Sequence, residues 1–365
     1  MKYSIDSANC QNSTFLRSCQ GCTDCFGCTN LVNKQYYIFN KPYTKDEYQK
    51  YMSEINLGSH KVVESMRERW EELVYDLIVK EYQGVNIENS SGNYLRNVKN
   101  CQDCYECDNS EDLRYSYCLE GVKDSMDYSY WGVNAERIYE CQAGGFDIYN
   151  LKFCNVCWSS CRDLMYCDHT HHSKDCFGCV GLRNKQYCIL NKQYSKEEYE
   201  ALVPKLIEHM QKTGEWGEFF PTKYSLYGYN ETLANEQIPL NKEEILRNGW
   251  IYKELEEKGI PDQKAETTDH ISEVTDDILS QVLVCEKSGK AYKIIKPELD
   301  FYRRNGIPIP RLCPDERHER RLKMRNPRKL WDRLCELCQK SIRTSYSPDR
   351  PEKVYCEECY LKTVY

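Results

Sequence analysis

Four cysteines close to the C-terminus have the spacing of a metal site. Cys335 and Cys338 form one Cys-x-x-Cys pair, Cys356 and Cys359 form a second, and seventeen residues separate the two pairs. A Cys-x-x-Cys turn presents two thiolates on one side of an ion, and Zn²⁺ prefers four such ligands in a tetrahedron. We therefore predict one structural Zn²⁺ ion bound by these four thiolates, with no coordination position left open for catalysis.

A second candidate metal site precedes this one and has poorer ligands. Cys285 and Cys313 are spaced like two ligands of another pair of knuckles, but their partner positions hold Ser288 and Glu316. A hydroxyl oxygen is a weak zinc ligand, so this segment is expected to fold without metal around an apolar core. That predicted core consists of Ile294, Leu299, Phe301, Tyr302 and Ile307. The alternative is a weak second zinc site formed by Cys285, Cys313, Glu316 and His318.

Cysteines three residues apart also occur far from the C-terminus, at positions 19, 22, 25 and 28 and again at 101, 104 and 107. Another zinc site and a redox-active iron–sulfur cluster are both alternatives, although cluster-binding ferredoxins use a longer last step followed by proline. Residues 25–48 align without a gap to residues 176–199, with 16 of 24 positions identical. On this offset Thr170 and Ser173 replace Cys19 and Cys22. Such replacement favours interior packing over metal ligation.

Three histidines lie among cysteines in the second copy of the repeat. His169, His171 and His172 fall between Cys167 and Cys176. A metal site or a Cys–His nucleophile would use this combination, whereas the first copy has no histidine at these positions. A polar turn is the simpler interpretation. Because neither a Gly-rich phosphate loop nor a Gly-x-Ser-x-Gly motif occurs, the sequence favours a non-enzymatic protein.

The C-terminal part is basic and the remainder is acidic. Residues 285–365 hold 20 Lys and Arg against 12 Asp and Glu, whereas the whole chain has a net charge of −7. The cations proposed to contact a partner are Arg317, Arg320, Arg321, Lys323, Arg325, Arg328 and Lys329. Nucleic acid would bind such a band in a salt-dependent manner, and an acidic protein is the alternative partner. A third possibility is that the band binds the acidic body of the same chain.

Two helix starts follow the repeat copies. Thr44 with Glu47, and Ser195 with Glu198, have the spacing of capping boxes. After the first box, apolar residues at helical spacing predict a helix that continues through residues 62–82. A third box, Asn241 with Glu244, predicts a short helix that ends near Gly259.

Residues 98–192 show a loose period of about twelve residues. Each segment has a core of Tyr, Cys or aliphatic residues flanked by Asn, Asp, Ser or Gly, which favours a mainly β fold with a parallel β-solenoid. We expect two segments per coil and ladders of Cys and Tyr inside. A meandering antiparallel β-domain is the alternative.

The segment 283–318 resembles a small bacterial family known as the probable zinc-ribbon domain, with two ligands lost. The motifs RNPRKLWDRLCELC and TSYSPDRPEKVYCEECY, with the NKQY and GYNET stretches, resemble an uncharacterised bacterial family of cysteine-rich zinc-ribbon proteins. The resemblance implies a tandem ribbon module at the C-terminus and brings no established activity.

Together these features predict six parts. They are the first repeat copy (1–44), a helical insertion (45–84), the repeat region (85–194), a helix with an extended wrap and linker (195–280), the degenerate ribbon (281–333) and the zinc ribbon (334–365). No apolar run long enough to span a membrane occurs, and 23 cysteines suit the reducing cytoplasm. We expect a zinc-stabilised binding or scaffold protein.

Overall fold

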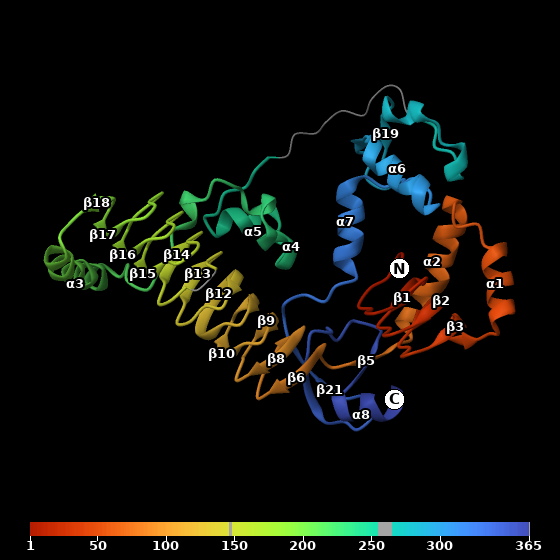
Figure 1. The fold of residues 1–365 in the computed structure, drawn as a ribbon, viewed down its shortest axis with the longest axis horizontal. Coiled ribbons are helices and arrows are strands. Elements are labelled where there is room, and N and C mark those ends of the chain that lie inside the picture. Colours follow the sequence, from red (N-terminus) through yellow and green to blue (C-terminus); the bar gives the residue numbers. More distant parts are fainter. Residues whose placement is uncertain (146–147, 255–264, 365) are drawn as a thin grey trace.

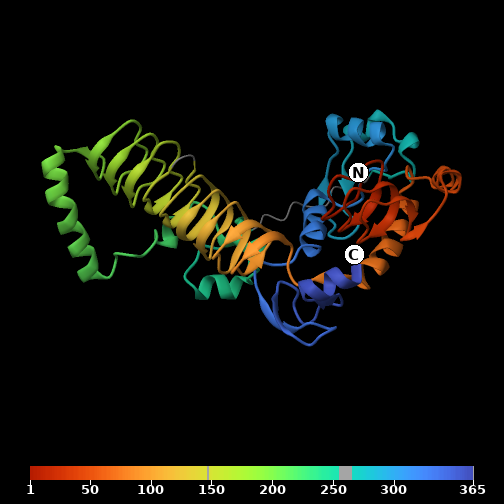
Figure 2. The same cartoon turned by 60° about the horizontal axis from the view of Figure 1, so that its bottom comes forward.

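The computed structural model describes residues 1–145, 148–254 and 265–364. Within these residues the protein is mainly β, and most strands are parallel (Figures 1 and 2). The first stack comprises β1 (Thr14–Arg17), β2 (Thr23–Thr29), β3 (Gln35–Ile38) and β4 (Lys41–Pro42). No described helix is both long and apolar enough to cross a lipid bilayer.

The second stack contains thirteen strands. They are β6 (Gly84–Glu88), β7 (Gly92–Asn93), β8 (Leu95–Lys99), β9 (Cys104–Asp108), β10 (Glu111–Arg114), β11 (Tyr117–Glu120), β12 (Lys123–Val133), β13 (Tyr139–Gln142), β14 (Lys152–Asn155), β15 (Arg162–Met165), β16 (Lys174–Phe177), β17 (Gln186–Ile189) and β18 (Lys192–Gln193). Figure 2 shows that successive turns of this stack lie in sequence order along one axis.

Apart from the antiparallel hairpins β3–β4 and β17–β18 that end the two stacks, the strands pair in parallel with strands one repeat later in the chain. Thr14 pairs with Phe26 in the first stack, and Leu164 pairs with Cys176 in the second, twelve residues apart in both cases. Since a strand meets its own successor after a single segment, one segment makes one coil. The expectation of two segments per coil was therefore wrong, and the antiparallel meander does not describe these pairings.

Left-handed residues at every third position shape the coil. From Tyr3 to Phe39, every third residue has a positive φ. Asn, Asp and Gly tolerate this conformation best, which explains their abundance in the repeats. From Asn9 to Gly27, the residue after each of them is buried, as Ser13, Leu16 and Cys19 illustrate. The Cys-x-x-Cys runs are thus the inward positions of a three-residue pattern.

Thiols and hydroxyls are interchangeable at these inward positions because both donate to backbone carbonyls. Cys22 Sγ donates to the carbonyl oxygens of Gln20 and Leu31, at 3.5 and 3.3 Å. At the equivalent position of the other copy, Ser173 Oγ donates to the carbonyl oxygen of His171 at 2.9 Å. Cysteines do fill the interior as expected. Most tyrosines do not, with Tyr128 the fully buried exception, because they lie at outward positions such as Tyr36 and Tyr187.

Helices follow each repeat copy at the predicted residues. Thr44 caps α1 (Lys45–Glu54) and Ser195 caps α3 (Lys196–Thr213), both with complete capping boxes. The helix predicted over residues 62–82 is instead α2 (His60–Tyr75), and Leu77 lies beyond its end. The chain then forms the short strand β5 (Ile78–Lys80), which pairs with a strand near the C-terminus. A tertiary strand partner therefore overrides the helical pattern here.

The remaining described elements cover the second stack and build the C-terminal part. They are α4 (Leu233–Gln237), α5 (Lys242–Arg247), β19 (Leu283–Val284), β20 (Ala291–Tyr292), α6 (Lys296–Asn305), α7 (Pro314–Lys323), β21 (Trp331–Leu334), β22 (Ser341–Thr344), β23 (Lys353–Tyr355) and α8 (Glu357–Val364), with 3₁₀ turns at 222–224, 229–231, 271–273 and 276–279. Asn241 caps α5 as predicted, but this helix ends at Arg247; Gly259 lies outside the described residues.

Candidate metal centre

The first cysteine pair lies in a turn between two antiparallel strands, β21 and β22. The backbone N–H of Cys335 donates to the carbonyl of Lys340 at 2.8 Å, and that of Gln339 donates to the carbonyl of Cys335 at 2.9 Å. Gln339 has a φ of 63°, which closes the turn. This tight turn holds Cys335 and Cys338 on the same side of the chain.

The second pair begins where β23 passes into α8. Cys356 precedes the helix and Cys359 lies in its first turn, so the helix orients both side chains. The four sulfurs lie within 4.8 Å of one another, and theirs is the only such group found among the described residues. Three of these cysteines are buried and Cys338 is exposed. The four cysteines predicted as ligands thus converge and could hold a metal ion.

Backbone N–H groups at this site favour the ionised form of the Cys335 thiol. Burial alone would raise the pKa of the Cys335 thiol, but N–H groups of Cys338, Cys356 and Leu337 bring that pKa down to about 6. The N–H of Cys356 lies 3.2 Å from the Cys335 sulfur. At Cys359, the hydrogen bond with Cys356 and burial raise the pKa. Clustered sulfurs cannot all ionise without a cation between them, so this arrangement suits a divalent ion.

The module that carries the four cysteines, residues 331–364, packs into the body of the protein. Strand β23 pairs in parallel with β5, with Val354 opposite Val79. Cys335, Cys356 and Cys359 belong to the same apolar cluster as Phe15 and Trp70 of the first stack and α2. The candidate metal centre is therefore part of a core shared with residues hundreds of positions earlier in the sequence.

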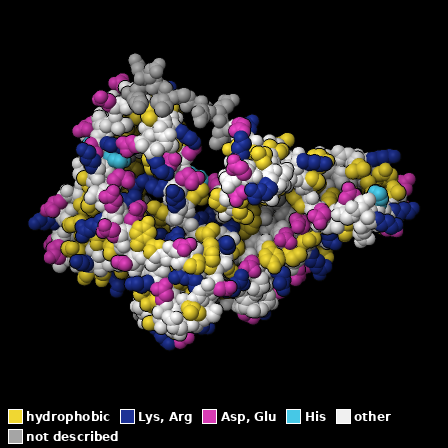
Figure 3. Space-filling view, turned by 180° about the vertical axis from the view of Figure 1, so that it is seen from behind, with side chains coloured by type: hydrophobic (Ala, Val, Ile, Leu, Met, Phe, Trp, Pro, Cys, Tyr) yellow, Lys and Arg dark blue, Asp and Glu magenta, His cyan; other side chains and the backbone are white. Residues whose placement is uncertain are grey.

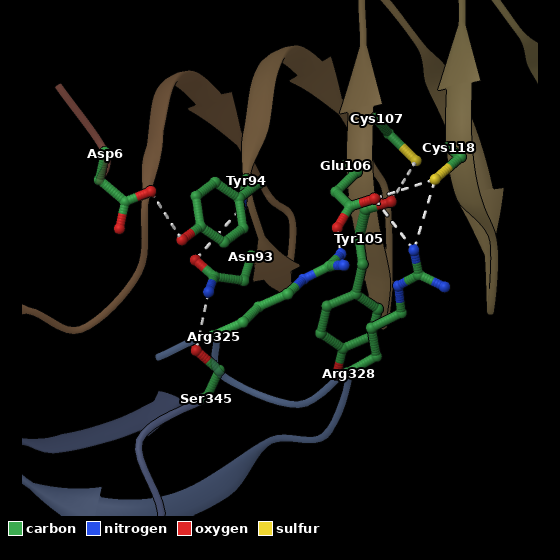
Figure 4. A network of polar contacts seen from close by, with 10 residues as sticks. All are labelled: Asp6, Asn93, Tyr94, Tyr105, Glu106, Cys107, Cys118, Arg325, Arg328 and Ser345. Atoms are coloured by element: carbon green, nitrogen blue, oxygen red, sulfur yellow. Dashed lines mark hydrogen bonds and ion pairs between the residues drawn. The ribbon is translucent and has the colours of Figure 1, made fainter. Parts of the chain in front are cut away.

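The module also contacts the second stack. Asn93 donates to the hydroxyl of Ser345 at 2.8 Å in a buried contact (Figure 4). Arg343 also pairs with Asp103 at 3.0 Å. Beside Asn93, Tyr94 donates to Asp6 at 3.1 Å, which joins the two stacks directly. The C-terminal module thus lies at the junction of both stacks.

The weaker candidate site upstream does not assemble. Cys285 makes the same kind of turn as Cys335, since its N–H donates to Lys290 at 2.9 Å. However, Glu316 pairs with Lys287, and His318 lies 2.9 Å from Glu236 of α4. Neither converges with the thiols of Cys285 and Cys313 in the described structure. Of the predicted core there, Ile294, Leu299, Tyr302 and Ile307 are buried, whereas Phe301 is exposed.

The histidines of the second copy also lie apart from the cysteines. His169 and His172 occupy left-handed positions, which point outward, while Cys167 is fully buried. The backbone of the coil thus separates the imidazoles of His169 and His172 from the buried thiol of Cys167, and these residues form no Cys–His pair. Cys19, Cys22, Cys25 and Cys28 are likewise inward and form no ligand group among the described residues.

The basic stretch largely faces the acidic residues of its own chain. Arg317 pairs with Glu298 at 3.0 Å, and Arg320 with Glu64 of α2 at 3.6 Å. Arg325 and Arg328 both pair with Glu106 of β9 (Figure 4). Figure 3 shows Lys and Arg side chains gathered where the two stacks meet. Of the other named cations, Lys329 lies over the Trp331 ring, and Arg321 lines a cavity with Asp6 and Asp108.

Sequence reasoning missed the acidic partners. Glu106 is one of many carboxylates in the repeats, and no local motif distinguishes it from its neighbours. Glu106 occupies the left-handed place of the three-residue pattern, directly before the inward Cys107. Knowledge of that pattern would have identified its side chain as outward.

Comparisons with known proteins add little. No family model matches the chain, and no curated protein matches it. Among solved structures, a crystal structure described as a "putative acetyltransferase" from Desulfovibrio desulfuricans G20 is 14% identical, with 47% of this chain and 43% of that chain covered. Its TM-score is 0.10, so this match carries no argument.

Proposed function

We propose that the protein is a zinc-stabilised, non-enzymatic scaffold in which a C-terminal zinc ribbon clamps two β-solenoids together. The observation that carries this proposal is the convergence of four thiols in a module that packs against both stacks. Zinc fits the donor set best, because Zn²⁺ favours four thiolates in a closed structural site. In both stacks, parallel strands pair with residues twelve positions later, which supports a solenoid architecture for each stack.

A protein partner is favoured over nucleic acid. Binding to nucleic acid requires cations that are available to phosphates. Arg317, Arg320 and Arg328 are instead engaged with carboxylates of the same chain. A redox or iron–sulfur function is disfavoured, because the thiols of the Cys-x-x-Cys runs bond to backbone carbonyls inside the coils.

Two further proposals follow from the same features. All 23 cysteines are unpaired, which fits a reducing compartment such as the cytoplasm. The matching turns at Cys285 and Cys335 support membership of the cysteine-rich zinc-ribbon family, with the first ribbon having lost its metal.

Metal analysis of the purified full chain tests the proposal. We expect one zinc and no iron per chain, and loss of that zinc in Cys335→Ser. The control Cys118→Ser changes a thiol at an outward position of the second stack and should keep the metal. A second zinc, or iron, would overturn this assignment.

The nucleic-acid alternative needs the full chain as well, because an isolated C-terminal fragment would expose arginines that are paired in the protein. Fluorescence polarisation with labelled RNA and DNA should show no binding that weakens with salt. Tight salt-dependent binding by the full chain would favour the nucleic-acid function instead.

A further inference from the structure

A groove of about 980 Å³ runs along the second stack. Residues of the second stack between positions 103 and 142 form its floor, and residues 219–251 form its roof. This volume lies in the range of ligand-binding clefts, which are typically lined by apolar and aromatic groups with few polar ones. The metal centre is not part of it.

Contacts at both ends of the roof hold this groove open. Near one end, Tyr166 donates to the carbonyl of Glu215 at 3.0 Å and accepts from the N–H of Gly217 at 3.0 Å. On the other side, His318 and Glu236 tie α4 to α7 at 2.9 Å. Within the roof, Tyr229 stacks on Trp250 with a centroid distance of 4.9 Å. The roof is therefore anchored, and the groove does not depend on a ligand for its shape.

Aromatic rings dominate the groove. Tyr105, Tyr115, Tyr117 and Tyr130 come from the floor, and Tyr227 and Trp250 come from the roof. Tyr115 and Tyr227 remain 57% and 62% exposed, so these rings have apolar faces without a cover. In Figure 3, hydrophobic and acidic side chains lie beside each other along this stack. Rings of this kind contribute large contact area at a low cost in conformational entropy.

Carboxylates without a cationic partner line one end of the groove. Asp127 and Glu140 lie on successive coils, and Glu218 lies beside Glu140. Burial raises the pKa of both Asp127 and Glu140, and Asp127 and Glu218 further raise the pKa of Glu140. No described cation is within ion-pair distance of these three groups. They are also too far apart to form one metal-binding group. A cationic group with several donors would complement them.

Two of the three cations at the opposite end have carboxylate partners, and the third, Lys329, lies over the Trp331 ring. Arg328 pairs with Glu106 and lies over the Tyr117 ring at 4.1 Å, and Arg343 pairs with Asp103. The groove thus has unpaired carboxylates at one end, aromatic rings along its length, and at the other end a carboxylate, Asp103, that is already paired. This asymmetry sets the direction in which a charged ligand would lie.

The length of the groove matches an extended peptide. Its edge runs from Asp103 through Tyr115 and Asp127 to Glu140, which is four coils. Neighbouring strands are about 4.8 Å apart, so three steps span roughly 14 Å, the length of about four extended residues. A chain of this length would place a basic side chain at the carboxylates while aromatic residues cover the exposed rings.

We propose that this groove binds an extended segment of a partner protein that carries Lys or Arg followed by aromatic residues. The inference rests on the proposed scaffold function, for which it names the chemistry of one partner. Its experiment is independent of that function, because the groove variants leave all four zinc-binding cysteines intact.

The test uses fluorescence polarisation with the full-length protein and a labelled peptide in which two lysines precede alternating tyrosine and serine. A peptide with glutamates in place of the lysines is the matched probe. We expect the lysine peptide to bind at least ten-fold more tightly than the glutamate peptide. Asp127→Asn combined with Glu140→Gln should remove this preference, while zinc content and the circular dichroism spectrum stay unchanged.

Two further variants separate the groove from general electrostatics. Asp124→Asn combined with Glu120→Gln removes the same charge from the same stack outside the groove and should leave peptide binding unchanged. Tyr115→Asn removes an exposed ring at a left-handed position that Asn tolerates, and should weaken binding.

Two outcomes would overturn the proposal: equal binding of both peptides, or unchanged binding by the variant that lacks Asp127 and Glu140. Spermidine that displaces the lysine peptide at equal concentration would also overturn it, because a free polyamine would then satisfy the site. If the variant binds peptide normally but the chain still holds one zinc, only the groove assignment fails.

Discussion

Arg328 donates to Glu106 at 3.0 Å while its guanidinium lies 4.1 Å from the centroid of the Tyr117 ring. Arg325 pairs with the same carboxylate. One glutamate on the second stack therefore binds two arginines of the stretch that leads into the C-terminal module. The contact connects parts of the chain separated by 222 positions.

We predict that Glu106→Gln weakens the junction between the stack and the C-terminal module. The variant leaves the largely covered Arg328 and the partly exposed Arg325 with a neutral acceptor, which should lower the free energy of unfolding by about 1.5–3 kcal/mol. Urea denaturation measures the change. Glu88→Gln removes one partner of an exposed ion pair with Lys99 and should cost less than about 1 kcal/mol. Equal effects of the two changes would contradict the special position of Glu106.

Loss of the metal should unfold the C-terminal module and expose β5. Structural zinc contributes about 10–16 kcal/mol of apparent free energy in small metal-binding peptides. Limited proteolysis with mass spectrometry should therefore locate new cleavages within residues 331–364 after chelation or in Cys335→Ser. Cys118→Ser should retain the pattern of the unmodified protein. A resistant Cys335→Ser chain without zinc would show that packing alone holds the module.

Substitutions at Cys22 should distinguish packing from metal ligation. Cys22→Ser keeps a donor for the carbonyls of Gln20 and Leu31, and the other copy already holds Ser173 there. We expect it to change stability by less than about 1 kcal/mol, whereas Cys22→Leu should cost about 1–3 kcal/mol through overpacking. Thermal denaturation and zinc analysis check both variants. Loss of a zinc ion in Cys22→Ser would mean that this run is a ligand set.

The groove carboxylates should give a characteristic pH dependence. In the folded protein the pKa values of Asp127 and Glu140 are raised, chiefly by burial. The folded state therefore holds these protons more tightly than the unfolded state, so both groups lower stability above their folded pKa values. As pH falls through the folded pKa values, this penalty disappears.

The variant with Asp127→Asn and Glu140→Gln should accordingly be as stable as the unmodified protein, or more stable, at pH 7. Its advantage should vanish below the usual carboxyl range, where both proteins carry neutral groups at these positions. Urea denaturation at several pH values measures the difference. A variant that is less stable at pH 7 would mean that these carboxylates have favourable partners.

Local patterns predicted the parts of this protein whose chemistry is local. A Cys-x-x-Cys turn and a capping box each depend on residues a few positions apart, so Cys335 with Cys338 and Thr44 with Glu47 could be identified directly. The duplication likewise identified Ser173 as equivalent to Cys22, and with it the packing role of the cysteine runs. The predicted number of segments per coil was wrong, because the period alone does not say whether a segment pairs with the segment that follows it directly or with the one after that.

The sequence by itself determined the four cysteines that could hold a metal ion, the helix starts and the mainly β character of the repeats. Only the tertiary structure decided that Ile78–Lys80 is a strand and not the end of a helix, because its partner Lys353–Tyr355 is hundreds of residues away. It also decided that Arg325 and Arg328 face Glu106 and not an external polyanion. The charges along a sequence do not say which surface each charged side chain will face. Here the coils decide it, because every third residue of a coil points inward and Glu106, at an outward position, is left facing the two arginines.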